Sequence, residues 1–234
     1  MSLDDKVVLI TGAAGNLGRA VAAAFAAAGA TLVLLDIGDA ALAKAYPGQD
    51  AKRLLLAADL MDATSAQQAV DTALARLGRI DCLCNVAGGF HYGPAVHETT
   101  PELWKRMMDL NAGTVLNMAH AVVPAMLKAG AGRIVNIAAG GGLKGGGHMA
   151  AYSAAKSAVI RLTESMSAEL REQGINVNCV LPSVIDTPAN RADMPNADPK
   201  KWVAPADLAS VIVFLCSDGA RAVHGASVPV VGLS

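Results

Sequence analysis

Short apolar segments alternate with helix-forming segments along the whole chain, and this alternation constrains the fold more than any other feature of the sequence. Each apolar segment is a short, nearly continuous run of residues such as Val, Ile and Leu, which is typical of strands buried on both faces. Seven segments have this character: 6–11, 31–36, 53–58, 80–84, 132–138, 175–181 and 226–231. Buried strands separated by helices form a parallel sheet covered on both faces, as in doubly wound α/β proteins.

The segments between these strands have the composition and the end signals of helices. Helices are expected over 20–29, 65–77, 101–129, 152–173 and 205–217. Thr100 is a suitable N-cap for the third of these helices, and Gly174 is a suitable end for the fourth. The chain has 234 residues, of which 53% are hydrophobic, so it is long enough to bury one large core. We therefore expect a single α/β domain over residues 1–234.

The charge and the cysteines exclude several classes of function. The net charge is −1 and there is no basic stripe, so neither nucleic acid nor an anionic membrane is an expected partner. Cys82, Cys84, Cys179 and Cys216 form no CxxC and no zinc-type spacing, so no metal site is expected. Reduced, structural cysteines suit a cytoplasmic protein. The polar start of the chain predicts no signal peptide, and the lack of about 18 uninterrupted apolar residues predicts no membrane span.

A glycine-rich turn, TGAAGNLG over 11–18, joins the first strand to the first helix. Glycines there allow a sharp turn and let a pyrophosphate approach the amino end of the helix. Asp36 ends the next strand, 18 residues after Gly18. Its carboxylate can accept hydrogen bonds from both ribose hydroxyls of an adenosine and repels a 2′-phosphate. Because neither Gly15 nor Ile37 is basic, NAD(H) is the expected cofactor in preference to NADP(H).

Tyr152 and Lys156 lie four residues apart in AYSAAK, and therefore on one face of the expected helix. Reduction of a C=O or C=N bond by hydride creates a negative charge that needs a proton. A phenol with an ordinary pKa near ~10 donates poorly at neutral pH unless its anion is stabilised. Lys156 can lower that pKa and can also hold the nicotinamide ribose. A surface tyrosine beside a solvated lysine is the alternative interpretation, and the cofactor motif in register favours the catalytic one.

The glycine turn and the AYSAAK segment resemble the short-chain dehydrogenase/reductase family, and the resemblance covers essentially the whole chain. Asn16 replaces the middle glycine of the family's TGxxxGxG motif, and Asn tolerates left-handed backbone better than most residues. The resemblance implies one Rossmann-type doubly wound domain with a seven-stranded parallel sheet in the order 3-2-1-4-5-6-7. It also implies an NAD(P)-dependent oxidoreductase that transfers hydride between nicotinamide and a small-molecule C=O, C–OH or C=N group.

The resemblance assigns residues to the site. Tyr152 is the expected general acid or base, Lys156 its electrostatic partner, and Asn111 the anchor of a proton-relay water. The segment 178–187 (NCVLPSVIDT) resembles the family's nicotinamide-holding NxxxPGxxxT, with Ser183 in place of Gly. The expected cofactor contacts are Gly12, Gly15, Asn16, Leu17, Gly18, Asp36, Asp59, Leu60, Asn85, Ala87, Gly88, Tyr152, Lys156, Pro182, Ile185 and Thr187. The family's long helices commonly pair between subunits, so a homodimer or homotetramer through these helices is expected.

Ala139 departs from the family pattern. Most members carry a serine thirteen residues before the tyrosine, where its hydroxyl binds the substrate carbonyl, but no Ser or Thr stands between Ile134 and Tyr152 here. Loss of one such donor typically costs ~2.7–4 kcal/mol of transition-state stabilisation. Lys144 and His148 are weaker candidates for a substitute donor. The departure leaves open a different substrate, or an NAD-binding sensor or partner protein with weakened catalysis.

One branch of the family, the dihydropteridine reductases, carries alanine at this position. The segments 86–90 (VAGGF) and 186–202 (DTPANRADMPNADPKKW) resemble that branch locally. The resemblance implies a conjugated pterin-type imine as an alternative substrate. The region 187–204 is then the expected substrate lid, with Trp202 and Phe90 as candidates to stack on a flat heterocycle. Packing of Trp202 in the core or at a hinge is the alternative interpretation.

Overall fold

Seven strands hydrogen-bond in parallel into one sheet in the computed structural model, which describes residues 2–234. The strand order is β3-β2-β1-β4-β5-β6-β7, as the family resemblance predicted. The strands are β1 (Val7–Thr11), β2 (Thr31–Asp36), β3 (Arg53–Ala57), β4 (Cys82–Asn85), β5 (Gly132–Ile137), β6 (Ile175–Pro182) and β7 (Ser227–Val230). Every expected strand is present, and its ends differ from the expected ends by at most two residues.

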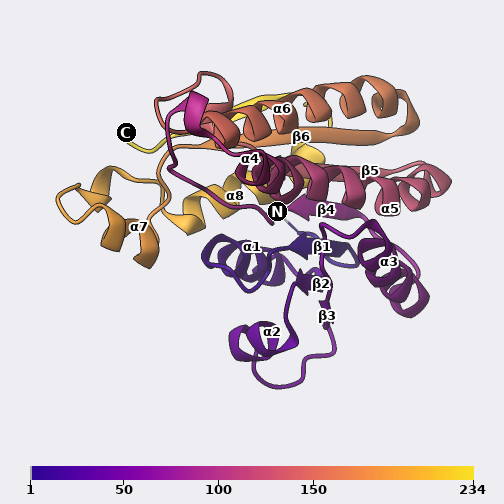
Figure 1. The fold of residues 1–234 in the computed structure, drawn as a ribbon. Helices are drawn as coiled ribbons and strands as arrows, with labels where there is room; N and C mark the ends of the chain where they lie inside the picture. The colour runs from indigo at the N-terminus through magenta and orange to yellow at the C-terminus, as the bar shows by residue number, and fades with distance from the viewer. Residues whose placement is uncertain (1) are drawn as a thin grey trace.

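Helices cover both faces of the sheet, with α1 and α8 on one side and α3 and α5 on the other (Figure 1). The helices are α1 (Asn16–Ala27), α2 (Asp39–Ala45), α3 (Ala63–Leu77), α4 (Pro101–Met108), α5 (Thr114–Ala129), α6 (Ala150–Leu170), α7 (Pro188–Asp193) and α8 (Pro205–Cys216). The side chains of each strand alternate between the two helix layers, because successive side chains of a strand point to opposite faces of the sheet. Val8 and Ile10 pack with α1 and α8, whereas Val7 and Leu9 pack with α3 and α5.

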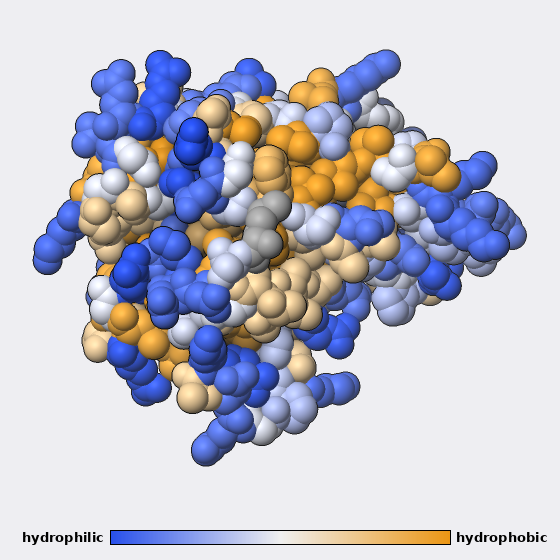
Figure 2. All heavy atoms as spheres, turned by 180° about the vertical axis from the view of Figure 1, so that it is seen from behind, coloured by the Kyte–Doolittle hydropathy of each residue, from blue (hydrophilic) through white to orange (hydrophobic). Residues whose placement is uncertain are grey.

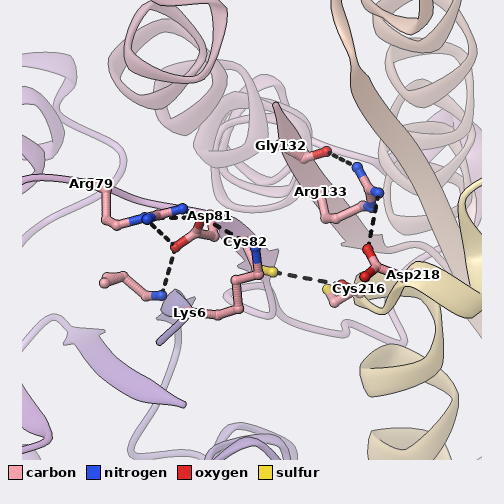
Figure 3. A network of polar contacts seen from close by, with 9 residues as sticks. Lys6, Arg79, Asp81, Cys82, Gly132, Arg133, Cys216 and Asp218 are labelled. Atoms are coloured by element: carbon pink, nitrogen blue, oxygen red, sulfur yellow. Dashed lines mark hydrogen bonds and ion pairs between the residues drawn. The ribbon is translucent and has the colours of Figure 1, made fainter. Parts of the chain in front are cut away.

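Ion pairs and contacts of buried thiols stabilise the amino-terminal ends of the central strands (Figure 3). Asp81, just before β4, accepts a hydrogen bond from the Val7 amide (2.8 Å) and forms an ion pair with Arg79. Cys82 and Cys84 share the face of β4 that packs against the end of α8, as their spacing predicted, and the Sγ atom of Cys84 lies 4.0 Å from that of Cys216. All four cysteines are free and buried. These contacts leave the carboxyl-terminal edge of the sheet for the site.

The long helix expected over 101–129 is divided by a single π-helical segment, Asp109–Gly113, between α4 and α5. The side-chain amide of Asn111 donates to the carbonyl oxygen of Met107 (3.1 Å), and a side-chain donor of this kind competes with the ordinary helical hydrogen bond. The π-helical segment turns Asn111 into the protein, where only 1% of its surface is exposed. The irregularity therefore lies at a residue that the sequence had marked for function.

One helix begins well before its expected start, and two short helices were not expected. α1 begins at Asn16, four residues earlier than expected, and Asn16 does not have left-handed backbone. The short helix α2 was not expected, because only Leu42 of its seven residues is buried and the apolar pattern is weak. The short helix α7 lies within the segment expected to be a loop, where Pro188 at its first turn and the hydroxyl of Thr187, which accepts from the Asn190 amide, stabilise its start.

The stretch Pro101–Ala129 has the length and composition of a membrane-spanning helix, with a mean hydropathy of 1.2 in its most apolar window. Half of that window is buried inside the fold, and core helices of other proteins pass the same test. Hydrophilic side chains cover much of the face opposite to that of Figure 1, and apolar surface forms patches between them (Figure 2). The stretch packs on α3 and on the sheet.

Candidate functional site

A cleft of about 760 Å³ opens at the carboxyl ends of β1, β2 and β4. In a doubly wound sheet this is the point where the strand order reverses, and ligands bind there. Eleven of the expected cofactor residues line it: Gly12, Gly15, Asn16, Leu17, Gly18, Asp36, Asp59, Leu60, Ala87, Gly88 and Thr187. These eleven residues come from five separate parts of the chain.

The glycine turn forms the floor of this cleft because the backbone packs closely there. Gly12 has a φ of 61°, and a Cβ atom at this position would lie 2.9 Å from the backbone of Ala87. A Cβ atom at Gly18 would overlap the carbonyl oxygen of Gly12. Gly15 caps α1 with extended backbone, so the free amides at the start of α1 face the cleft. A bare backbone in front of a helix amino end is suited to a pyrophosphate.

The carboxylate of Asp36 is held at the end of β2 by two backbone amides. One oxygen accepts from the amide of Ala14 and the other from the amide of Ile37, each at 2.9 Å. These contacts orient the side chain along the wall of the cleft. Asp59 lines the same cleft, and its carboxylate accepts from the amide of Met61 (2.9 Å). The acidic wall has the composition that suits ribose hydroxyls and disfavours a phosphate.

Lys156 and Asn111 converge on Gly88 beside the cleft. The Nζ atom of Lys156 donates to the carbonyl oxygen of Ile137 (2.8 Å), and 6% of the residue is exposed. The Oδ1 atom of Asn111 accepts from the amide of Gly89 (3.1 Å). A Cβ atom at Gly88 would lie 2.8 Å from that Oδ1 atom and 3.3 Å from the Lys156 Nζ atom. The glycine therefore lets both polar groups reach the cleft edge.

Tyr152 lies one helical turn before Lys156 on α6, and its ring meets the ring of Phe90 edge to face, with centroids 4.9 Å apart. Burial raises the pKa of Tyr152 to about 12, and burial lowers the pKa of Lys156 to about 8. The expected lowering of the phenol pKa by the lysine is therefore wrong for this structure. Burial disfavours the charged phenolate, and it also disfavours the charged form of the neighbouring lysine.

Residues 6–198 match the family described as short chain dehydrogenase. The chain belongs to this family. D-threitol dehydrogenase of Mycolicibacterium smegmatis is 35% identical, over 98% of this chain and 93% of that protein. The crystal structure of NAD⁺-bound xylitol dehydrogenase has a TM-score of 0.90 at 27% identity, over 99% of this chain and 100% of that one. The structure of 3-ketoacyl-(acyl-carrier-protein) reductase from Brucella melitensis with NADH has a TM-score of 0.90 at 30% identity, over 99% and 98% of the two chains.

Like its relatives named dehydrogenases and reductases, this short-chain dehydrogenase is an oxidoreductase. Ala139 stands directly after β5 with extended backbone, is 6% exposed, and precedes the helical turn Gly140–Gly142. A Cβ atom at Gly141 would lie 3.6 Å from the Tyr152 ring, so this loop does face the phenol. Lys144 is exposed on this loop and His148 lies just before α6, so both stay candidates for the substitute donor.

Two residues that were candidates for ligand contacts are buried. Asn85 does not reach the cleft: it is buried, and its amide donates to the Oδ1 atom of Asn136 (2.8 Å) inside the sheet. Trp202 is not free to stack on a ligand, because it is 9% exposed; packing was the alternative interpretation. Pro182 is buried at the end of β6, and Ile185 forms a parallel bridge with Val203.

Two residues that hold the cofactor turn were missed by sequence reasoning. The hydroxyl of Thr11 accepts from the amides of Val86 and Ala87, each at 3.0 Å, and joins the ends of β1 and β4. A polar residue that ends an otherwise apolar strand is the signal for it. The hydroxyl of Tyr46 donates to the carbonyl oxygen of Ala13 (2.7 Å), and no local pattern indicated this contact between positions 33 residues apart.

Replacement of the buried lysine tests its charge state. Burial lowers the pKa of Lys156 from 10.5 to about 8, so between these pH values the unfolded chain keeps a proton that the folded chain has lost. The free energy of unfolding therefore rises with pH across this window, by up to roughly 3 kcal/mol. Lys156→Met abolishes the rise. Urea unfolding from pH 7.5 to 10 measures the difference in the free energy of unfolding between the wild type and Lys156→Met. The contributions of the other titrating groups are common to both proteins and cancel in this difference.

The matched control is Lys144→Met, which removes an exposed lysine. Its unfolding free energy should follow that of the wild type at a constant offset. Curves for Lys156→Met that also run parallel to the wild type would show that Lys156 is not desolvated.

Proposed function

We propose that this short-chain dehydrogenase is an NAD(H)-dependent oxidoreductase that uses Tyr152 as its general acid and base. Its substrate is a small molecule with a carbonyl, alcohol or imine group. The observation that carries the proposal is the convergence of Lys156 and Asn111 on Gly88, at the edge of a cleft built for a dinucleotide and one helical turn from the Tyr152 ring. Relatives bound to NAD⁺ and NADH support the choice of cofactor.

The bound nicotinamide supplies or accepts the hydride. Tyr152 gives its phenolic proton to the substrate oxygen or nitrogen during reduction, and takes a proton back during oxidation. Lys156, which donates to the carbonyl oxygen of Ile137 and lies beside Gly88, holds the nicotinamide ribose, and burial lowers its pKa to about 8. Asn111 lies in the π-helical segment beside Gly88. There it anchors the water through which the proton of Tyr152 is replaced.

Tyr152→Phe tests the proposed proton transfer. The rate constant kcat should fall by ~10²–10⁴-fold, since the phenol hydroxyl is the group that carries the proton. Binding of NADH, followed by its fluorescence, should be unchanged. Turnover is measured as NADH oxidation with a panel of ketones and quinonoid dihydropterin, and as NAD⁺ reduction with alcohols.

Ser210→Ala is the control, because it removes the hydroxyl of an exposed residue on α8 that does not line the cleft, and it should leave kcat unchanged. Equal turnover by Tyr152→Phe and the wild type would exclude Tyr152 as the proton donor. NADH binding without turnover of any compound would favour the alternative of a sensor or partner protein.

Asp36 is proposed to select NAD(H) over NADP(H). Two backbone amides hold its carboxylate in place, and the side chain would lose both hydrogen bonds if it moved aside. A 2′-phosphate would therefore meet a fixed negative charge. Asp36→Ser should raise the ratio of kcat/KM for NADPH to that for NADH by ~10–100-fold, because juxtaposed like charges cost several kcal/mol. The assay is oxidation of each cofactor with one substrate.

Asp39→Ser is the control for net charge, since Asp39 opens α2 close by but does not line the cleft. Its cofactor ratio should match that of the wild type. A ratio that stays constant in Asp36→Ser would contradict the assignment.

A pterin-type reductase is the second candidate function, and Ala139 favours it. A conjugated imine accepts hydride more readily than a simple ketone does, so it depends less on a hydroxyl that polarises its reacting bond. The loop after β5 faces the Tyr152 ring with alanine and three glycines, and offers no hydroxyl. The local resemblance to dihydropteridine reductases agrees with this substrate.

Ala139→Ser restores the missing donor. Turnover of simple ketones should rise about tenfold or more, given that loss of one such donor costs 10²–10³-fold in kcat. Turnover of quinonoid dihydropterin should change little. Gly140→Ser is the matched control, because it adds a hydroxyl one residue later, where a Cβ atom meets nothing within 4 Å. An equal gain in both variants, or none in Ala139→Ser, would refute this role of position 139.

We also propose that the chain forms a homo-oligomer through its long helices. A groove of about 310 Å³ lies along α5 and α6, and its lining is mostly apolar. Leu116 on its rim is 57% exposed. Apolar surface on two adjacent long helices supports a helix pair between subunits, which analytical ultracentrifugation can measure.

A further inference from the structure

The segment 88–93, which leaves the nucleotide cleft after β4, is fastened at both ends. The amide of Gly89 donates to the Oδ1 atom of Asn111 (3.1 Å), and the amide of Gly93 donates to the carbonyl oxygen of His148 (2.7 Å). A Cβ atom at Gly89 would lie 2.8 Å from the Leu110 side chain, so the absence of a side chain allows this close contact. The residues between the two glycines are therefore held by the backbone.

Phe90 occupies the position between the cleft and the phenol. It lines the cleft, and its ring meets the Tyr152 ring at 4.9 Å with an interplanar angle of 84°. An edge-to-face pair leaves much of one ring uncovered, and 59% of Phe90 is exposed. An exposed large apolar side chain is informative where it borders a functional site, because it is available to a ligand.

A second aromatic pair follows two residues later. The rings of Tyr92 and His148 lie 5.5 Å apart with an interplanar angle of 33°, and 65% of Tyr92 is exposed. His148 has a φ of 61°, which is uncommon for a residue with a side chain. Backbone strain of this kind is found at functional sites more often than elsewhere. Phe90 and Tyr92 thus both contact the part of the chain that leads into α6 and carries Tyr152.

We propose that Phe90 and Tyr92 form an aromatic wall of the substrate site, and that this wall selects substrates with a planar aryl or conjugated group next to the reacting carbon. The inference rests on the proposed function, since Tyr152 fixes where the reacting carbon lies. A substrate oxygen at the phenol places its substituent beside the free surface of Phe90.

The residues that face Tyr152 from the loop after β5 also favour an aryl or conjugated substrate. A site that recognises a polyol needs polar groups for each hydroxyl, because discrimination by hydrogen bonds depends on such partners. The turn Gly140–Gly142 and Ala139, which face Tyr152 from the end of β5, carry no polar side-chain atom. Aromatic rings, by contrast, bind a flat ring in offset or edge-to-face geometry.

A matched pair of activated ketones, each with one carbonyl next to the ring, tests the wall: 2,2,2-trifluoroacetophenone and cyclohexyl trifluoromethyl ketone, each reduced with NADH. The two rings are similar in size, but only one is planar. We expect kcat/KM to be about two- to tenfold higher for the phenyl compound, which is the range that aromatic pairing provides. Phe90→Leu should bring the ratio close to one, mainly through the KM of the phenyl compound, and Phe90→Tyr should keep the preference.

Trp104→Leu is the control variant, since it removes a half-exposed aromatic ring that lines a different hollow, and it should leave the ratio unchanged. Equal kcat/KM for both compounds in the wild type, or an equal loss for both in Phe90→Leu, overturns the proposal.

Binding separates this inference from the proposed function. Benzyl alcohol and cyclohexylmethanol are titrated against the protein with NAD⁺ and followed by saturation-transfer NMR. Selective binding of benzyl alcohol that Phe90→Leu abolishes supports the wall, even where Tyr152-dependent turnover is absent and the proposed function fails. Equal binding of the two alcohols overturns the wall, even where Tyr152-dependent turnover is present.

Discussion

The junction between the ends of β1 and β4 is the contact on which the site depends. The Thr11 hydroxyl accepts from two successive amides after β4, and Gly12 has no side chain to keep the backbone of Ala87 away. The adjacent strands β1 and β4 both end at this junction, and α1 begins shortly after β1. A bulky residue at Gly12 would push the strand ends apart, so the floor of the cleft and the position of Gly88 follow from one close backbone contact.

The same contact accounts for the unusual state of Lys156. Gly88 can lie beside both Asn111 and Lys156 because the chain after β4 is held close to β1. The lysine is then enclosed, and burial disfavours its charged form. Such a lysine lowers stability at neutral pH, as strained or desolvated groups at functional sites commonly do. The buried lysine therefore lowers stability at the place where the proposed chemistry uses it.

The strands and most helices could be predicted because their apolar patterns are long and regular. β2 matches its expected range, whereas α2 and α7 were missed because each is short and buries little. Local motifs also placed the cofactor turn and Asp36. They did not indicate that Asn85 is buried in the sheet or that burial raises the pKa of Tyr152, since both depend on what surrounds the side chain. Burial is a property of the packed fold, and a motif specifies only which residue types are adjacent.

Ala139, which departs from the family pattern, and the aromatic pair of Phe90 and Tyr92 bear on the same substrate. A missing hydroxyl leaves the substrate's reacting bond without a donor, so the bond must be activated within the substrate itself. Conjugation to a flat ring provides that activation, and a flat ring is what an aromatic wall binds. A loss of catalytic help at Ala139 and a gain of binding surface at Phe90 therefore select the same chemistry. Either feature alone would leave a wider range of substrates.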